Sequence, residues 1–451
     1  MEGFRVIEGG KGSNQGAQPE SNLFDDFERE VNQIQGTAPG DTNAAGKPVD
    51  KPADKPAASP LPVDPPVPLI AANDRRWAWL EIDREAVRHN LKALRKRIGP
   101  GVKIMGVVKA DAYGHGALEV AKVAITHGAE YLAVANVDEG IELRDAGITK
   151  PILVLAEPPQ TTIPALLHYN LIPTVYNMEF ALALGETADQ QGRVSPFHLK
   201  IDTGMNRIGV HHSDAADFLR TVGFHRGLEL QGVFTHFATA DLHDTYELKL
   251  QLDRFNAAIE NIRYFGIDPG IIHAANSAAA IRYKQTHYDM VRIGIAMFGL
   301  HPGDTTRELI DLRPVMSVRS RVNCIKNVPV GEGVSYAYSY HSPGNVRIAT
   351  VPVGYGDGLS RSLSNRMDML IKGRLCPQVG NICMDLSMIE INQRSSTLNP
   401  RLDVELGDEV IVIGRSGNQE LTLDAMARKL GTISYELACI FGLRLNKVYK
   451  N

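Results

Sequence analysis

The feature that most constrains the fold is an alternation, beginning at Trp77, of short β-branched apolar runs with helix-length amphipathic stretches. This pattern is typical of a parallel α/β fold, in which a helix follows each strand and covers the sheet. Eight such runs precede Leu312: VKIMGVVK (102–109), YLAVA (131–135), ILVLA (152–156), LIPTV (171–175), FHLKID (197–202), LQGVFTHF (230–237), GIIHAAN (270–276) and MVRIGIAMFG (290–299). Eight strands close a (β/α)8 TIM barrel, and a segment of about 235 residues agrees with the usual length. We therefore predict such a barrel over residues 75–311.

The texture of the sequence changes after the eighth run. Segments such as NVRIATVPVGYGDG and DEVIVIG are short, alternating and bounded by turn residues, with little helical periodicity before residues 422–430. This texture predicts a mostly antiparallel β domain over residues 312–451.

Residues 1–74 differ in composition from the rest of the chain. They hold 10 of the 25 prolines and 12 acidic against 6 basic residues, a local charge of 6 − 12 = −6. Such a segment cannot bury enough apolar surface to offset its chain entropy, so we predict a disordered N-terminal extension. Within residues 21–35, a helical stripe of apolar side chains leaves two interpretations open, a frayed helix without a role or a helix that docks onto an unidentified partner.

Charge and cysteine usage exclude several classes of protein. The 48 basic and 52 acidic residues give 48 − 52 = −4, which provides no electrostatic footprint for nucleic acid or an anionic membrane. No stretch reaches 18 consecutive apolar residues, and the N-terminus does not resemble a signal peptide. Four cysteines without a C-x-x-C pair suggest reduced thiols in the cytoplasm and no metal site. The near-balance of charge indicates a small-molecule partner.

Polar residues close several of the predicted barrel strands, where the active sites of such barrels gather. Lys109 ends the first run after four apolar residues. Burial lowers the pKa of a lysine, which makes its neutral amine available as a nucleophile toward a carbonyl such as that of pyridoxal phosphate. The other strand ends contribute Lys200, Asp202, Arg207, His236, Asn276, Ser277, Arg292 and Gly294. The HAANSAA turn and the glycine of RIGIAMFG offer small residues and free backbone N–H groups, which suit a phosphate monoester.

Ordered motifs along the chain resemble those of bacterial alanine racemases, which are fold-type III pyridoxal-phosphate enzymes. The resemblance covers about Arg75 to Lys450 and rests on GVVKADAYGHG, HLKIDTGMNRIG, THFATAD, HAANSAA, VRIGIAMFGL, EGVSYAYSY, VGYGDG, VGNICMD and TISYE. It implies interconversion of L-alanine and D-alanine, the latter a peptidoglycan precursor, by a cytoplasmic homodimer with shared active sites. Asn206 stands where the family often has glycine, and Gly356 where it often has alanine.

The resemblance also implies roles for individual residues. Lys109 would hold the cofactor and act as the base on one face of the substrate, and Tyr336 would be the base on the opposite face. Arg207, Met384 and Tyr355 would bind the substrate, and Lys200 corresponds to a lysine that is carbamylated in several relatives. The remaining cofactor contacts would come from Tyr113, Arg207, His236, Asn276, Ser277, Arg292, Gly294, Ile295 and Tyr435.

Three other functions compete with alanine racemisation. An amino-acid decarboxylase on the same scaffold would have an acidic residue at the pyridine nitrogen, where this chain has Arg292. A non-catalytic pyridoxal-phosphate carrier would end with the barrel, whereas about 140 further residues follow here. A serine or broad-specificity racemase would use the same residues, because one extra hydroxyl group in a pocket discriminates only modestly.

Overall fold

The computed structural model describes residues 75–391 and 402–451. The predicted extension, including the apolar stripe within 21–35, lies outside the described residues. The chain divides into one unit of residues 1–67 and a second of residues 68–451, and the fold below belongs to the second. None of its described helices is long and apolar enough to cross a membrane.

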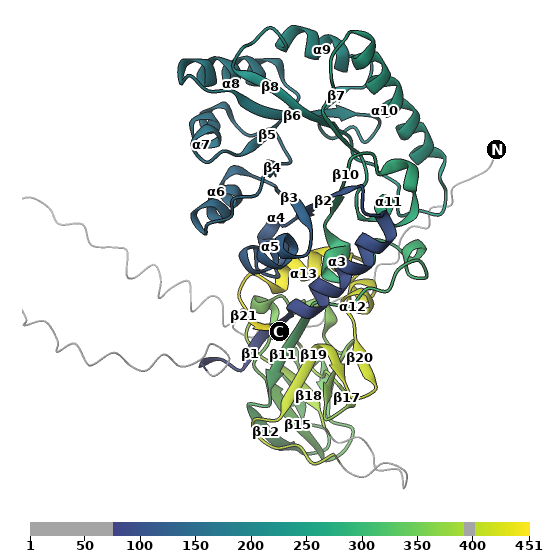
Figure 1. Ribbon diagram of the computed structural model, residues 1–451. Helices are drawn as coiled ribbons and strands as arrows, with labels where there is room; N and C mark the ends of the chain where they lie inside the picture. The colour runs from purple at the N-terminus through teal and green to yellow at the C-terminus, as the bar shows by residue number, and fades with distance from the viewer. Residues whose placement is uncertain (1–74, 392–401) are drawn as a thin grey trace, which may run out of the picture. The chain divides into compact units, whose positions relative to one another are not determined.

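Eight parallel strands form the barrel, and each corresponds to one of the eight predicted runs (Figure 1). They are β2 (Lys103–Val107), β3 (Ala129–Val134), β4 (Ile152–Val154), β5 (Ile172–Val175), β6 (Ser195–Asp202), β8 (Leu228–Phe234), β9 (Ile271–His273) and β10 (Met290–Ile293). A short strand, β7 (Val210–His211), pairs with β6. The strand order is β10-β2-β3-β4-β5-β6-β8-β9, and the Arg292 N–H donates to the Ala275 carbonyl at 2.9 Å where the ring closes. The predicted fold class is thereby confirmed.

Helices between the strands cover the outside of the barrel (Figure 1). They are α3 (Arg84–Ile98), α5 (Ala117–Thr126), α6 (Val137–Asp145), α7 (Ile163–His168), α8 (Met178–Gln190), α9 (Ala215–Val222), α10 (Tyr246–Tyr264) and α11 (Ser277–Arg282). The short element α4 (Lys109–Tyr113) follows the carboxyl end of β2 and has a left-handed backbone inside. Asn136 and Asn177 show why the sequence begins helices at these places. Each side-chain oxygen accepts a backbone N–H of the first turn, which satisfies a donor that has no partner within the helix.

The second domain consists mainly of antiparallel strands, as predicted. Its strands are β11 (Met316–Arg321), β12 (Cys324–Val328), β13 (Gly333–Val334), β14 (Tyr340–His341), β15 (Val346–Val351), β16 (Asp368–Ile371), β17 (Arg374–Pro377), β18 (Ser387–Glu390), β19 (Glu409–Ser416), β20 (Gln419–Leu421) and β21 (Asn446–Lys450). Helix α12 (Leu423–Leu430) occupies the predicted helical stretch, and α13 (Ser434–Phe441) is a second helix that the periodicity did not indicate.

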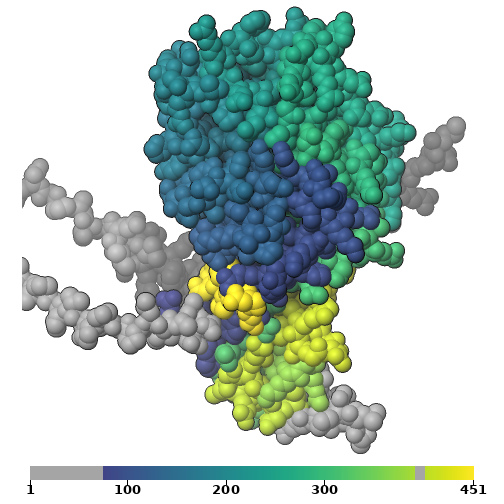
Figure 2. Space-filling model, viewed as in Figure 1, coloured from purple at the N-terminus to yellow at the C-terminus, as the bar shows by residue number. Residues whose placement is uncertain are grey.

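One strand lies in a sheet that the sequence pattern did not indicate. β1 (Ala78–Asp83) is placed within the predicted barrel range of 75–311, but it pairs with β11 and with β21 of the second domain. Four of the six residues of β1 are buried, so the strand lacks the regular alternation of buried and exposed residues that would have indicated its place in the second sheet. In Figure 2 the C-terminal residues, drawn in yellow, lie where the barrel meets this second sheet.

Candidate active site

A cavity of about 320 Å³ opens at the carboxyl ends of the barrel strands, a size within the usual range for small-molecule sites. It contains the predicted catalytic and cofactor-binding residues of the barrel together with Lys200 and with Tyr435 of α13. These are Lys109, Tyr113, Lys200, Arg207, His236, Asn276, Ser277, Arg292, Gly294, Ile295 and Tyr435. Residues more than 300 positions apart therefore meet in one cavity. Asp202, by contrast, accepts the Gly204 and Asn206 N–H groups and does not line the cavity.

Lys109 enters the cavity from an unusual backbone turn. The four residues that follow it, Ala110, Asp111, Ala112 and Tyr113, all have φ between +51° and +53°. A left-handed backbone costs a residue with a side chain roughly 1–2 kcal/mol, so this turn must be held by its surroundings. Burial lowers the pKa of Lys109, and the nearby Arg207 lowers it further. The neutral amine is therefore accessible at a lower pH than for a free lysine.

One end of the cavity carries neutral hydrogen-bond donors. The Ser277 hydroxyl accepts the Gly294 N–H at 3.1 Å, and the phenol of Tyr113 is so close to Gly294 that a Cβ atom there would lie 2.7 Å from its oxygen. The rings of Tyr113 and Tyr435 meet edge to face at 6.3 Å. Burial raises the pKa of both phenols, so they stay protonated and can donate hydrogen bonds. This donor set fits a phosphate group.

Arg292 lies on the other side and is held by the barrel core. Its two terminal nitrogens donate to the carbonyls of Thr235, His273 and Ala274 and to ring nitrogens of His236 and His273, all at 2.7–3.2 Å. Burial lowers the pKa of Arg292 to about 9, which still leaves it protonated at neutral pH. Burial and Arg292 hold the pKa of His236 well below its usual range, so its ring is a neutral acceptor. Among the described residues the Arg292 Nε–H has no hydrogen-bond partner, so it can donate to a ligand.

The charges in the cavity favour an anionic ligand. Lys200 Nζ lies 4.4 Å from the centre of the Phe234 ring, and the Arg292 guanidinium lies 5.3 Å from the same ring. Burial, then Arg292 and Arg207, lower the pKa of Lys200 well below its usual range. Asp241 is the one acidic residue among those that line the cavity, so the positive charges of Lys200, Arg207 and Arg292 repel one another there. A negatively charged ligand would reduce this repulsion.

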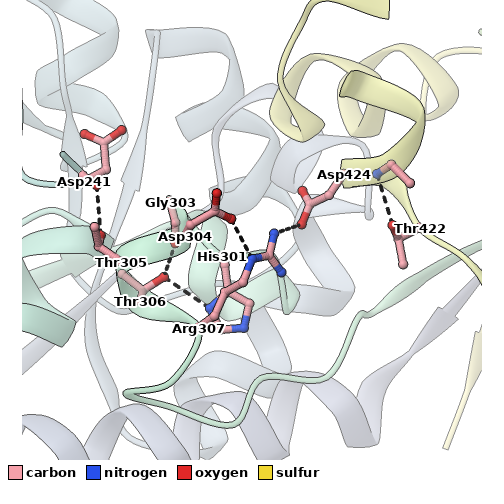
Figure 3. A network of polar contacts seen from close by, with 10 residues as sticks. Asp241, His301, Gly303, Asp304, Thr305, Thr306, Arg307, Thr422 and Asp424 are labelled. Atoms are coloured by element: carbon pink, nitrogen blue, oxygen red, sulfur yellow. Dashed lines mark hydrogen bonds and ion pairs between the residues drawn. The ribbon is translucent and has the colours of Figure 1, made fainter. Parts of the chain in front are cut away.

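A loop after the last barrel strand lies between Asp241 of the barrel and Asp424 of α12 (Figure 3). Pro302 of this loop lines the cavity, and the Thr305 hydroxyl donates to the Asp241 carbonyl at 2.8 Å. On its other side, Arg307 pairs with Asp304 at 2.8 Å and with Asp424 of α12 at 2.7 Å. The loop thus links the barrel to the helices of the second domain.

Asn276 lines the cavity, but its side chain is already engaged. Its oxygen accepts the Ala279 N–H at 3.0 Å and its amide donates to the Phe237 carbonyl at 3.3 Å. The side chain therefore caps α11, and a contact of Asn276 with the cofactor stays a prediction.

Three predicted residues of the second domain do not line this cavity. Tyr336 begins the 3-10 turn Tyr336–Tyr338, and 71% of it is exposed. Met384 and Tyr355 are also exposed, and they lie on neighbouring loops because the Gly356 N–H donates to the Met384 carbonyl at 2.9 Å. Asn381 donates to the Tyr336 carbonyl at 2.7 Å, which joins all three to one exposed surface of the second domain.

His198 and His273 also belong to this site, and no sequence motif indicated them. Both are fully buried, and their ring nitrogens Nδ1 and Nε2 lie 2.8 Å apart, so they continue the hydrogen-bond chain from Arg292 into the barrel core. Strand alternation offered a signal for one of them, since His198 is two residues from Lys200 and must share its face. Phe234 has the same relation to His236.

Comparison with known proteins identifies both parts of the chain. The model of the alanine racemase N-terminal domain matches residues 82–302, and that of the alanine racemase C-terminal domain matches residues 315–449. An alanine racemase of Halothermothrix orenii is 42% identical over 83% of this chain and 97% of its own length. One from Synechocystis is 40% identical over 83% of this chain and 99% of its own.

Solved structures agree. An alanine racemase of Bacillus anthracis with bound L-Ala-P has a TM-score of 0.78 and 36% identity, covering 83% of this chain and 95% of that one. A histidine racemase from Leuconostoc mesenteroides has a TM-score of 0.75 and 30% identity, covering 83% of this chain and 98% of that one. The shared domains, the similarity over nearly the whole length of these relatives and the common fold lead to one conclusion: the chain belongs to the alanine racemase family.

Proposed function

We propose that this protein interconverts L-alanine and D-alanine with pyridoxal phosphate as its cofactor. The observation that carries the proposal is the position of Lys109, a lysine of lowered pKa, in a positively charged cavity of the barrel. Such an amine can bind an aldehyde cofactor and can exchange a proton with a substrate. D-alanine made in this way would supply peptidoglycan synthesis in the cytoplasm.

The cavity residues fit pyridoxal phosphate. Ser277, Tyr113, Tyr435 and the backbone of Gly294 and Ile295 would hold the phosphate, for the donor set described above faces that end. The Arg292 Nε–H would donate to the ring nitrogen. When bound, pyridoxal phosphate withdraws electrons from the bond to the substrate's α-hydrogen and makes this hydrogen acidic.

Two bases on opposite faces of the substrate are needed to exchange its configuration. The neutral Lys109 amine would accept the proton of one enantiomer, and the Tyr336 hydroxyl would exchange the proton on the other face. Arg292 stays a hydrogen-bond donor because its pKa remains above neutrality, so it does not hand its proton to the cofactor. With no proton placed on the cofactor ring by Arg292, protonation of the substrate at its α-carbon is favoured.

A second copy of the chain would complete each site. Tyr336, Met384 and Tyr355 share an exposed surface of the second domain and do not line the cavity of their own chain. In a homodimer, this surface would bring Tyr336 to the partner's Lys109, while Met384 and Arg207 bind the substrate carboxylate and Tyr355 lines the way in. Lys200, whose amine is driven toward its neutral form, would react with carbon dioxide and carry a carbamate.

The proposal is tested by isotope exchange at the α-carbon in deuterated water. Wild-type protein should label both alanine enantiomers, Lys109→Ala should label neither, and Tyr336→Phe should lose the exchange that starts from L-alanine. Borohydride reduction followed by digestion should find the cofactor on Lys109. Cofactor on another lysine, or equal residual exchange from both enantiomers in Tyr336→Phe, would contradict the assignment.

Substrate choice needs a separate measurement, because the Leuconostoc relative is named for histidine. Racemisation rates for alanine, serine and histidine should rank alanine first. A carrier function is not favoured, since the second domain matches the family's own C-terminal domain over residues 315–449. The division into 1–74, 75–311 and 312–451 stays a proposal, which limited proteolysis followed by mass spectrometry would test.

A further inference from the structure

One side chain connects the left-handed turn after Lys109 to the end of the neighbouring strand β3. The carboxylate of Glu139, on α6, accepts the Ala110 N–H at 2.7 Å with one oxygen and the Ala135 N–H at 2.7 Å with the other. Ala110 is the first residue of the turn and directly follows Lys109, while Ala135 follows β3. Glu139 therefore bridges the ends of two neighbouring barrel strands.

The rest of the turn has its own supports. Asp111 accepts the Ala117 N–H at 2.7 Å and pairs with Lys447 of β21 at 2.8 Å. The His115 ring donates from Nδ1 to the carbonyls of Ala112 and Tyr113, both at 2.9 Å. These contacts hold the end of the turn that carries Tyr113. Among the described residues, Glu139 is the one side chain that forms a hydrogen bond with Ala110, the residue directly after Lys109.

We propose that Glu139 is a positioning residue, which keeps the Lys109 amine at the cofactor cavity by holding the strained backbone beside it. This inference rests on the proposed function, because it concerns the delivery of Lys109 to pyridoxal phosphate. A carboxylate suits the task, since its two oxygens can each accept one N–H and hydrogen bonds to a charged acceptor are the strong ones. An amide in its place accepts with one atom only and turns a donor toward the other N–H.

Glu139 also acts on Lys109 through its charge. Burial has the largest effect on the lysine, and three groups add to or oppose it: Arg207, in the loop after β6, lowers its pKa, while Glu139 and Cys439 of α13 raise it. Without the negative charge of Glu139, the effect of Arg207 on the pKa of Lys109 is less compensated, so this pKa should fall further. A residue that served stability alone would not shift this titration.

The test compares Glu139→Gln with Glu139→Asp and with a matched control, Glu142→Gln. Glu142 is on the same helix and exposed, so the control removes the same charge without the two hydrogen bonds. The cofactor is stripped from the full-length protein, and uptake of pyridoxal phosphate is followed by absorbance as a function of concentration and pH.

Glu139→Gln should bind pyridoxal phosphate roughly ten-fold or more weakly, as expected for a lost hydrogen bond to a charged group. The midpoint of its uptake rate should move to lower pH. Glu139→Asp should weaken binding while keeping the midpoint, because its shorter side chain keeps the charge but cannot span both N–H groups. Glu142→Gln should match the wild type in both measurements.

A glycine variant tests the strain directly. Glycine adopts positive φ without the cost that alanine carries, so Ala110→Gly in the Glu139→Gln background should recover part of the lost affinity. If Glu139→Gln kept the wild-type affinity and midpoint, the role of Glu139 would be overturned and the proposed function would stand. If Ala110→Gly recovered no affinity, backbone strain would not explain the effect of Glu139. Failure of the wild-type protein to take up pyridoxal phosphate would instead overturn the proposed function.

Discussion

Single residues explain the two departures from the family pattern. Asn206, where glycine is frequent, has φ +54°, a left-handed conformation that asparagine tolerates better than most other residues. At Gly356, where alanine is frequent, an added Cβ would collide with the Arg444 guanidinium and lie 3.1 Å from the Met384 carbonyl. Arg444 pairs with Asp385 at 2.5 Å, so the missing methyl group makes room for this ion pair beside Met384.

Buried histidines should make the protein sensitive to acid. Burial lowers the pKa of His115 and of His198 to about 4, below the unfolded value near 6.5. Each therefore contributes stability that is complete above pH 6.5 and is lost as the pH falls toward 4. His115→Asn keeps a donor for the turn but no longer titrates, so between pH 7 and pH 4.5 it should lose about 2–3 kcal/mol less unfolding free energy than wild type.

Urea unfolding at each pH measures this difference. His168→Asn, at an exposed histidine at the end of α7, is the control and should follow the wild-type pH dependence. The same acid loss in His115→Asn as in wild type would mean that His115 does not remain neutral in the folded protein.

At the scale of elements, the turn α4 depends on its close approach to α13. Gly114 ends the turn with φ +81°, and a Cβ there would collide with the carbonyl of Ala438 and lie 3.1 Å from the Gly442 Cα. Helix α13 in turn brings Tyr435 to the cavity wall beside Tyr113. The two elements that supply both phenols are thus packed against each other through backbone.

Gly114→Ala should destabilise the protein by more than the cost of its backbone conformation. Gly431 ends α12 in the same left-handed region as Gly114, with φ +71°, and no atom lies within 4 Å of an added Cβ there, so Gly431→Ala measures the conformational cost alone, about 1–2 kcal/mol. Gly114→Ala should add roughly 1–3 kcal/mol for overpacking and weaken cofactor binding. Equal losses of unfolding free energy in the two variants would show that α4 and α13 separate without cost.

At the scale of the whole molecule, the segment that precedes the barrel belongs to the second domain. β1 pairs with β11 and β21 in the second sheet, and the chain then enters the barrel through α3. Just before β1, Arg76 pairs at 2.6 Å with Asp357, a fully buried carboxylate beside the Tyr355 loop. Folding of the second domain therefore requires residues that precede the barrel.

Two truncations should separate the extension from the fold. Removing residues 1–74 spares Arg76 and β1, so turnover, dimerisation and thermal midpoint should match the full chain. Removing residues 1–83 deletes a strand between two others and should leave protein that does not fold. Activity assays, sedimentation and thermal melts check both, and a monomeric or inactive protein lacking only 1–74 would place the boundary earlier.

The sequence by itself determined the eight barrel strands and the polar residues that close them. Both follow from local rules, because apolar runs and strand ends are visible within a few neighbouring residues. The tertiary structure alone decided that β1 joins the second sheet, that Glu139 holds Ala110, and that His198 and His273 continue from Arg292. It also decided that Tyr336 is exposed and does not line the Lys109 cavity of its own chain. These contacts join residues 29 to several hundred positions apart, and no periodicity specifies which distant partner a buried polar group will meet.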